Sequence, residues 1–165
     1  MATNEAILVF TTGGTIDKQY FDAISRYAIT ETIIARLLEV ARVTHPFRVE
    51  EVMRKDSLDI VDADRASLAA RVRNVAESRI VITHGTDTMT DTARTLAGIP
   101  GKTIVLVGAL TPARFAESDA AFNLGMAFAV AQIAPPGVYI TMNGSVFDGN
   151  KVAKDRDMGQ FVPIG

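Results

Sequence analysis

Residues 6–18 read AILVFTTGGTIDK, an apolar run followed at once by a cluster of threonines and glycines. Nearly continuous hydrophobicity is typical of a strand that is buried on both faces of a parallel sheet. The glycines allow the backbone to turn sharply after such a strand, but a turn alone does not require the neighbouring hydroxyl groups. The stretch therefore predicts a buried strand at Ile7–Thr12 that ends in a loop with a chemical role.

The rest of the chain alternates between strand-type and helix-type segments. Further strands rich in Val and Ile are expected at Arg48–Arg54, Arg79–Thr83, Thr103–Val107 and Val138–Met142. Helices are expected at Glu31–Ala41 with Thr30 as N-cap, Asp64–Ala76, Thr88–Ala97 and Glu117–Ala134. The segment Asp17–Ile29 has no clean period and is interpreted as a loop or hairpin over the sheet edge. The alternation predicts an α/β fold, a doubly wound and mostly parallel sheet with helices on both faces, of Rossmann-like type.

Composition limits the classes of function. At 165 residues, with 48% hydrophobic and 22% charged residues, the chain is expected to form a single domain over residues 1–165. A net charge of −2 without a basic stripe argues against nucleic acid as a partner. The absence of cysteine excludes disulfides and thiolate metal sites. The N-terminus does not resemble a signal peptide. Asn123, Gln132 and the following Pro135-Pro136 make residues 120–134 a poor membrane span, so we expect a cytoplasmic protein without membrane contact.

Polar side chains follow four of the five expected strands. The segments after them are Gly13–Thr15, Lys55–Ser57, His84–Thr88 and Asn143–Gly144. Each could be turn or cap chemistry, because Asp87 or Thr86 could serve as the N-cap of the following helix. Ligands of open α/β sheets bind beyond the carboxyl ends of the strands, so the convergence of these segments on one edge favours a site.

Phosphate and metal motifs are absent. TTGGTI is not G-x-G-x-x-G, and Gly101-Lys102-Thr103 lacks the leading glycine of a Walker A loop and runs into a strand. The two histidines, His45 and His84, are too few for a convincing metal site. We therefore expect neither a nucleotide cofactor nor a bound metal.

TTGGTIDK, together with ITHGTDTMTDTA at residues 82–93, resembles the two signature motifs of the bacterial-type L-asparaginases, which are threonine amidohydrolases. The similarity extends to Asp56–Asp59 and to VFDGNKVAKDRD near the C-terminus, and covers essentially the whole chain. It implies the fold of the asparaginase N-terminal domain and hydrolysis of L-asparagine to L-aspartate and ammonia. Longer members carry a second, C-terminal domain, and this chain resembles the short members that lack it.

The resemblance also implies roles for individual residues. Thr15 matches the nucleophile and Lys154 the family's buried lysine, and the family's loop tyrosine corresponds to Tyr20 or Tyr27, with Tyr20 preferred. The implied catalytic residues are Thr15, Tyr20, Thr86, Asp87 and Lys154. The implied substrate-binding residues are Gly14, Asp56, Ser57, Thr86 and Asp87.

Physical chemistry is consistent with these roles. A threonine hydroxyl needs a neighbour that takes its proton, and Lys154 could do so through Thr86 if burial lowered its pKa, whereas Asp87 would oppose that shift. The sequence leaves this balance open. Asp56 and Asp87 could hold an α-ammonium group while Ser57 and backbone N–H groups hold the α-carboxylate. The glycines allow an oxyanion hole made of backbone N–H groups, and Thr12 is expected to be structural.

The segment Glu117–Ala134 is apolar around most of its circumference. A helix that covers one face of a sheet needs a single apolar stripe, so the pattern predicts a homodimer or a dimer of dimers with this helix at a two-fold interface. The alternative is a helix wholly buried inside the monomer. In the oligomer we expect a loop of the partner subunit to approach Asp87.

Two other functions remain alternatives to an asparaginase. One is a catalytically silent module that binds an amino acid, and the other is an amide-releasing subunit that feeds ammonia to a transferase acting on charged tRNA. The combination of Thr15, Thr86, Asp87 and Lys154 argues against a pure binding module, since binding alone would not need the lysine. The mild acidity of the chain argues against a tRNA partner.

Overall fold

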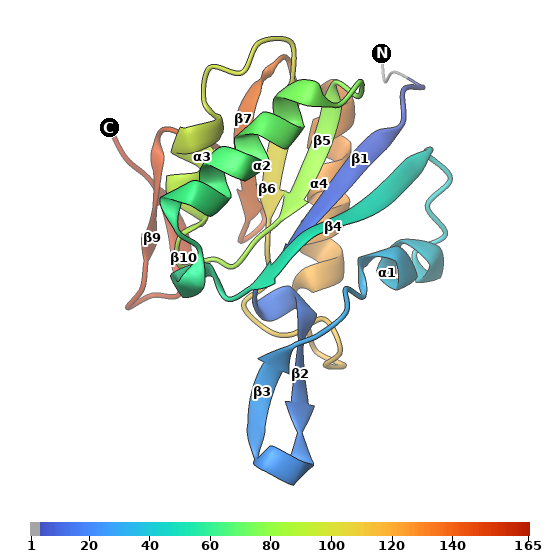
Figure 1. Cartoon of the computed structure of the whole chain (residues 1–165), viewed down its shortest axis with the longest axis vertical. Coiled ribbons are helices and arrows are strands. Elements are labelled where there is room, and N and C mark those ends of the chain that lie inside the picture. The colour runs from blue at the N-terminus through green and yellow to red at the C-terminus, as the bar shows by residue number, and fades with distance from the viewer. Residues whose placement is uncertain (1–3) are drawn as a thin grey trace.

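A computed structural model describes residues 4–165 as a twisted sheet of six strands flanked by helices (Figure 1). The strand order is β4-β1-β5-β6-β7-β8. The strands are β1 Ile7–Gly13, β4 Phe47–Lys55, β5 Arg79–Thr83, β6 Thr103–Val107, β7 Gly137–Met142 and β8 Ser145–Asp148. The first five are parallel to one another and β8 is antiparallel to β7. The predicted α/β fold with a mostly parallel sheet is confirmed.

The order of the strands determines where a ligand can bind. From β1 the chain first adds β4 on one side and then β5, β6 and β7 on the other. The connections on the two sides of β1 therefore run in opposite directions. In open α/β sheets this reversal opens a crevice at the carboxyl ends of the strands. The crevice is expected here between β1 and β5.

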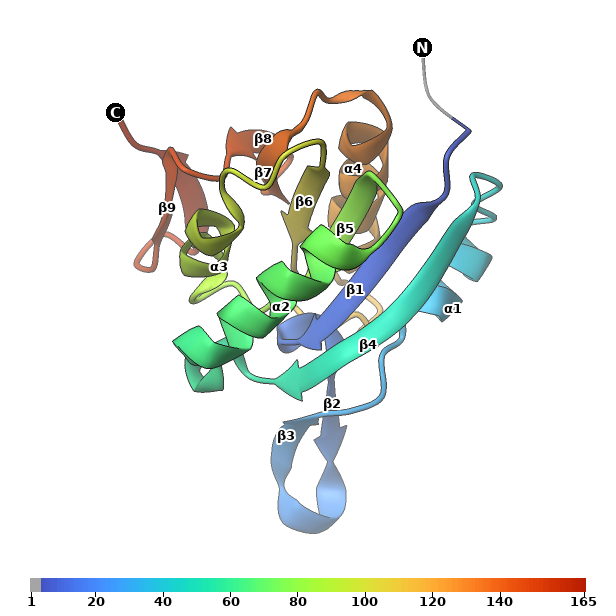
Figure 2. The ribbon, with the colours of Figure 1, turned by 45° about the horizontal axis from the view of Figure 1, so that its top comes forward.

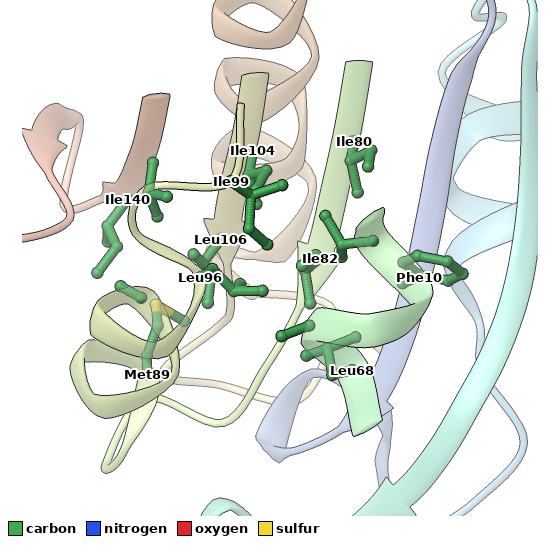
Figure 3. Close-up of a cluster of buried hydrophobic side chains, with 14 of the residues drawn as sticks. Phe10, Leu68, Ile80, Ile82, Met89, Leu96, Ile99, Ile104, Leu106 and Ile140 are labelled. Atoms are coloured by element: carbon green, nitrogen blue, oxygen red, sulfur yellow. The ribbon is translucent and has the colours of Figure 1, made fainter. Parts of the chain in front are cut away.

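Two helices cover each face of the sheet (Figure 2). They are α1 Ile34–Val40 and α4 Ala120–Ile133 on one face, and α2 Asp62–Asn74 and α3 Met89–Leu96 on the other. Successive residues of β1 alternate between the two cores, because Phe10 packs on the side of α2 and α3 while Val9 packs on the side of α1 and α4. Figure 3 shows the first core, where Ile82 and Leu106 of the sheet face Leu68 of α2 and Met89 of α3.

The expected helix starts were wrong by one to three residues, and hydrogen bonds of individual carboxylates account for the starts of α1, α2 and α4. Thr30 does not cap α1. Instead the Asp17 carboxylate accepts hydrogen bonds from the Ile33 N–H at 3.0 Å and the Thr32 hydroxyl at 3.2 Å. Helix α2 begins at Asp62 because the Asp64 carboxylate accepts from the N–H of Val61 at 3.0 Å.

The N-cap of α3 is Thr88. The interpretation of Thr86 or Asp87 as the cap was therefore wrong, and both side chains are free for other contacts. Helix α4 begins at Ala120 rather than Glu117. The residue before it, Asp119, accepts hydrogen bonds from the backbone N–H groups of Leu110 and Thr111, which holds the preceding residues in the loop after β6.

Two hairpins after β7 were not predicted. Asn143 and Gly144 both have positive φ, 54° and 70°, and form the two-residue turn from β7 into β8. The Asn143 side chain accepts from the N–H of Phe161 at 2.8 Å, so this segment, expected at the site, is structural. Beyond it, β9 Val152–Asp155 pairs with β10 Gln160–Pro163. The dipeptide Asn-Gly between apolar runs was the signal for the first hairpin.

The segment after β1 forms a hairpin that projects beyond the carboxyl end of the sheet, away from the body of the molecule (Figure 1). It consists of β2 Lys18–Phe21 and β3 Arg26–Ile29, joined through η2 Asp22–Ile24. Two further 3-10 turns, η1 Thr15–Asp17 and η3 Ser57–Asp59, follow β1 and β4. None of the helices between residues 4 and 165 has the length and apolarity that would let it cross a membrane.

Candidate functional site

Glycines bring the loops after β1, β4 and β5 into direct contact. Gly14 has a φ of 85°, and a Cβ atom there would lie 2.5 Å from the backbone nitrogen of Gly85. A Cβ atom on Gly13 would lie 2.5 Å from the carbonyl oxygen of Lys55, and one on Gly85 would lie 2.6 Å from the Cβ of Ser57. Any side chain at these positions would push the three loops apart. The glycines are therefore required for the strand ends to meet.

Thr15 is the first residue of η1, directly after this contact, and its side chain is half-buried. It lines a cavity of about 210 Å³. The other lining residues are Lys18, Tyr27, Pro112 and Phe115. Tyr20 does not line this cavity. Its ring packs on that of Tyr27 with 5.1 Å between centroids. The structure thus brings Tyr27 to Thr15, and the preference for Tyr20 finds no support in this geometry.

The β9 strand carries Lys154 to the loop after β5. Its Nζ donates to the hydroxyl of Thr86 at 2.7 Å and to Oδ1 of Asp87 at 2.8 Å. Thr86 is buried, and the Lys154 side chain is 15% exposed. Because its oxygen accepts from the ammonium group, the Thr86 hydroxyl keeps its own proton available for a second partner.

Asp56 and Ser57 lie at the carboxyl end of β4. Asp56 caps η3 by accepting from the N–H of Leu58 at 3.1 Å, and it forms an ion pair with Lys18 at 2.9 Å. Burial alone would raise the pKa of Asp56, but the hydrogen bonds from Lys18 and Leu58 outweigh it and hold that pKa below its usual value. Ser57 is buried beneath Gly85, and its carbonyl accepts from the Thr88 hydroxyl at 2.8 Å.

His84 lies under the β5 loop and has a structural role. His84 Nδ1–H donates to the carbonyl of Gly85 at 2.7 Å, which leaves Nε2 as an acceptor. The Thr92 hydroxyl donates to this Nε2 at 2.7 Å and itself accepts from Arg65 Nε at 3.3 Å. Burial lowers the pKa of His84 to about 4 and keeps the ring neutral. Within residues 4–165 no group of three or more His, Asp and Glu side chains is arranged to hold a metal ion.

The remaining polar residues of the opening stretch also have structural partners. Thr12 is fully buried, and its hydroxyl donates to the carbonyl of Thr83 at 2.7 Å, which ties β1 to β5. Asp17 is buried too, and this burial raises the pKa of its carboxyl group. Its hydrogen bonds to the start of α1 fix the base of the β2–β3 hairpin to that helix.

The sequence analysis missed Lys18 and the loop after β6. That loop reaches the site through Pro112 and Phe115, and it is joined to η1 by a hydrogen bond from the Ala113 N–H to the carbonyl of Ile16 at 3.1 Å. Its signal was present as the stretch at residues 108–116, between the fourth expected strand and the last expected helix, which has no clean period. No cluster of acids and hydroxyls directly follows this strand, so nothing in the sequence indicated that the loop reaches the site.

Most of the expected site residues lie together at the carboxyl edge of the sheet. These are Gly14, Thr15, Asp56, Ser57, Thr86, Asp87 and Lys154. A half-buried hydroxyl in a cavity, a cradle of glycine backbone and a lysine bound to a second hydroxyl form an arrangement suited to acyl transfer.

Comparison with known proteins agrees with this arrangement. The sequence profile described as "Asparaginase, N-terminal" matches residues 6–158. The chain is 32% identical to L-asparaginase 2 of Escherichia coli, over 96% of this chain and 49% of that protein. It is 32% identical to a glutaminase-asparaginase of Pseudomonas fluorescens biotype A, over 90% of this chain and 45% of that protein.

Other relatives extend the range of related functions. One of the subunits of a glutamyl-tRNA(Gln) amidotransferase from Thermococcus kodakarensis is 31% identical over 90% of this chain and 37% of its own length. The thermostable L-asparaginase of the same organism superposes with a TM-score of 0.86 at 28% identity, over 96% of this chain and 51% of that one. The chain thus spans about half the length of the first two relatives named above.

Proposed function

The chain belongs to the asparaginase family, whose N-terminal region it matches, and from this premise we propose that it hydrolyses L-asparagine to L-aspartate and ammonia with Thr15 as the nucleophile. The observation that carries the proposal is the contact of Lys154 with Thr86 and Asp87, beside the glycine cradle that holds Thr15. A site that only binds an amino acid would not need a lysine hydrogen-bonded to a buried hydroxyl.

The proposed reaction has two steps. In the first, Oγ of Thr15 attacks the carbon of the side-chain amide, a C–O bond forms, and the C–N bond breaks. The proton of Thr15 passes to the departing nitrogen, which leaves as ammonia. In the second step water attacks the resulting β-aspartyl ester, which releases L-aspartate and restores the Thr15 hydroxyl. Backbone N–H groups of the glycine cradle stabilise the negative oxygen that develops in both steps.

Two proton routes are available in this chain. One runs through Tyr27, which lines the same cavity as Thr15. The other runs through Thr86, whose hydroxyl can donate its proton to the departing nitrogen while it accepts a replacement proton from the Lys154 ammonium group. In both cases the role of Asp87 is to hold the ammonium of Lys154 in place.

Ammonia release from asparagine by the purified protein is the direct test. We expect turnover with L-asparagine and a kcat/KM for L-glutamine that is lower by at least ~10²-fold, because the extra methylene misplaces the amide relative to Thr15. Absence of ammonia with intact binding of aspartate would favour the amino-acid-binding module. Turnover only in the presence of a transferase and charged tRNA would favour the amide-releasing subunit, a function that the amidotransferase relative suggests.

We also propose that α4 forms the interface of a homodimer or a dimer of dimers. Its inward side packs on the sheet through Leu124, Ala127 and Phe128, whereas Phe122 is 64% and Ile133 73% exposed. The alternative of a helix wholly buried inside the monomer is therefore wrong. Light scattering is expected to give a multiple of 17.7 kDa. A fully active monomer would contradict this proposal, as would a partner copy that leaves Asp87 uncovered.

A further inference from the structure

Both carboxylates expected to hold the substrate's α-ammonium group already have lysine partners. Asp87 pairs with Lys154 at 2.8 Å, and Asp56 pairs with Lys18 at 2.9 Å. Asp56 also accepts from the N–H of Leu58. An incoming ammonium group would have to compete with a resident one at each position. The pair of Lys18 and Asp56 is the more consequential, because Lys18 itself faces the cavity of Thr15.

Lys18 stands between two cavities. It lines the cavity of about 210 Å³ that holds Thr15, and also a second cavity of about 380 Å³. Tyr27 is the other residue that the two cavities share. The Lys18 side chain is 26% exposed, so its ammonium group is accessible to a ligand that enters either space. Of its three N–H donors, one is used by Asp56, and two remain for a ligand.

The second cavity has one charged wall and one less polar wall. The charged wall comes from the end of β4 and from η3, with the residues Arg54, Lys55, Asp56 and Asp59. The opposite wall comes from β3, with the residues Tyr27, Ala28 and Ile29. With Lys18 included, the lining residues carry three cations and two carboxylates, but each cation already has an ion-pair partner, Asp56 for Lys18, Asp64 for Lys55 and Glu51 for Arg54. Asp59 is the lining carboxylate without an ion pair among residues 4–165, and it is exposed to solvent.

Beside Thr15 the unused N–H donors of Lys18 favour a carboxylate over an ammonium group. A carboxylate beside Lys18 gains a charge-assisted hydrogen bond and leaves the bond to Asp56 intact. An ammonium group there repels Lys18 and must displace it from Asp56. Acylation of the α-nitrogen removes this repulsion, and the wall formed by β3 offers an acyl group an apolar surface.

We propose that Lys18 determines specificity by binding the carboxylate of the substrate. The site then accepts side-chain amides whose α-nitrogen is acylated or absent at least as well as it accepts free L-asparagine. The substrate class is the monoamide of a short dicarboxylic acid, with or without an acylamino group. The inference rests on the proposed amide hydrolysis for its kinetic test, but not for its binding test.

The kinetic test compares amides on the wild-type protein. L-asparagine, N-acetyl-L-asparagine and succinamate differ in the α-nitrogen, and butyramide lacks the carboxylate. We expect kcat/KM for succinamate and N-acetyl-L-asparagine to equal or exceed that for L-asparagine. In Lys18→Met we expect the ratio of kcat/KM for succinamate to that for butyramide to fall by at least ~10-fold, the size of one charge-assisted hydrogen bond.

Lys55→Met is the matched control. Lys55 lines only the second cavity, and both oxygens of Asp64 already bind its Nζ, at 3.0 and 2.8 Å. This variant should change the same ratio by less than about threefold. An equal loss in both lysine variants would mean that the general positive charge, and not Lys18, selects the carboxylate, and the proposal would be overturned.

The binding test uses the reaction products and does not require turnover. Calorimetry on the wild-type protein should show succinate and N-acetyl-L-aspartate binding at least as tightly as L-aspartate, and Lys18→Met should weaken succinate by ~10-fold or more. If L-aspartate binds tenfold tighter than succinate, or if Asp59→Asn removes the affinity for L-aspartate, an ammonium subsite exists and the proposal fails. Binding through Lys18 without release of ammonia from any amide would reject the proposed function and retain this inference.

Discussion

The loops at the carboxyl ends of β1 and β5 and the β2–β3 hairpin lie at the same edge of the sheet but are built in opposite ways. The loops are buried, with Thr12, His84 and Thr86 at 0%, 1% and 7% exposure. The hairpin carries Ile24 and Tyr27 at 55% and 48% exposure. The first region is held by hydrogen bonds between buried groups, and the second by the pairing of β2 with β3, an ion pair and contacts between exposed aromatic rings.

The difference suggests that the loops hold the reacting groups in place and that the hairpin covers the cavity. Reacting groups must be held within a fraction of an ångström of their productive positions, which the glycine contacts and the buried threonines and histidine of the loops provide. The hairpin connects to the β6 loop by the ring contact of Tyr27 with Phe115, 6.0 Å between centroids. Such a contact is worth about 1 kcal/mol, and at the base of the hairpin the ion pair of Lys18 with Asp56 adds a second link to the loops.

Loss of Thr15, the proposed nucleophile, should have the largest effect. Thr15→Ala is expected to lower kcat/KM for L-asparagine by at least ~10³-fold, about 4 kcal/mol of barrier, with the free energy of unfolding changed by less than about 1 kcal/mol. Thr12→Ala should show the reverse pattern. It removes the buried bond to the Thr83 carbonyl and so lowers stability by about 1 to 2 kcal/mol, with a milder loss of rate. If Thr12→Ala were inactive and Thr15→Ala active, the hydroxyl proposed as the nucleophile would be the wrong one.

The buried histidine should make the stability of the sheet edge sensitive to acid. The pKa of His84 is about 4 in the folded chain against 6.5 as the reference value, so protonation favours the unfolded state. The stabilisation is complete above about pH 6.5 and is lost as the pH falls toward 4, by about 3 kcal/mol. Urea unfolding between pH 7 and 4 measures it. In His84→Gln, which keeps a donor and an acceptor, the decline should be smaller by that amount. Parallel declines would show that carboxylates alone cause it.

Lys154 tests whether the buried network contributes to the rate. Lys154→Met keeps the apolar stem and removes the ammonium that binds Thr86 and Asp87. We expect a loss of ~10²-fold in kcat, the lower end of the range for proton-transfer groups, with little change in urea stability. Lys151→Met, an exposed lysine near the start of the same strand, is the control and should be fully active. Normal turnover by Lys154→Met would remove this lysine from the mechanism.

The hairpin should show the smallest effect. Tyr27→Phe keeps the aromatic contacts and removes the hydroxyl, and we expect kcat to fall by ~10-fold because Tyr27 lines the cavity of Thr15. Tyr20→Phe should change kcat by less than about threefold, since its ring packs on Tyr27 outside that cavity. The opposite order would show that the hairpin rearranges when substrate binds and brings Tyr20 to the nucleophile.

The sequence alone determined the parts of this protein that depend on local pattern. Nearly continuous apolar runs located four of the five parallel strands, and Arg79–Thr83 and Thr103–Val107 have the expected bounds, whereas the edge strand β4 carries several charged residues. A strand that is buried on both faces consists mostly of apolar residues, so the ends of the apolar run predict the ends of the strand. The strand bounds also place Gly14, Thr15, Thr86 and Asp87 at the carboxyl edge of the sheet, because parallel strands all end at that edge.

The tertiary structure alone decided what depends on contacts between distant segments. Asp17 caps α1 across 16 positions, and Lys154 meets Thr86 across 68. No local pattern encodes such pairs, because their partners are chosen by the order of the strands. The same holds for the ion pair of Lys18 with Asp56 and for the choice of Tyr27 over Tyr20 beside Thr15. Both follow from the path of a hairpin whose exposed residues have no hydrophobic period to reveal it.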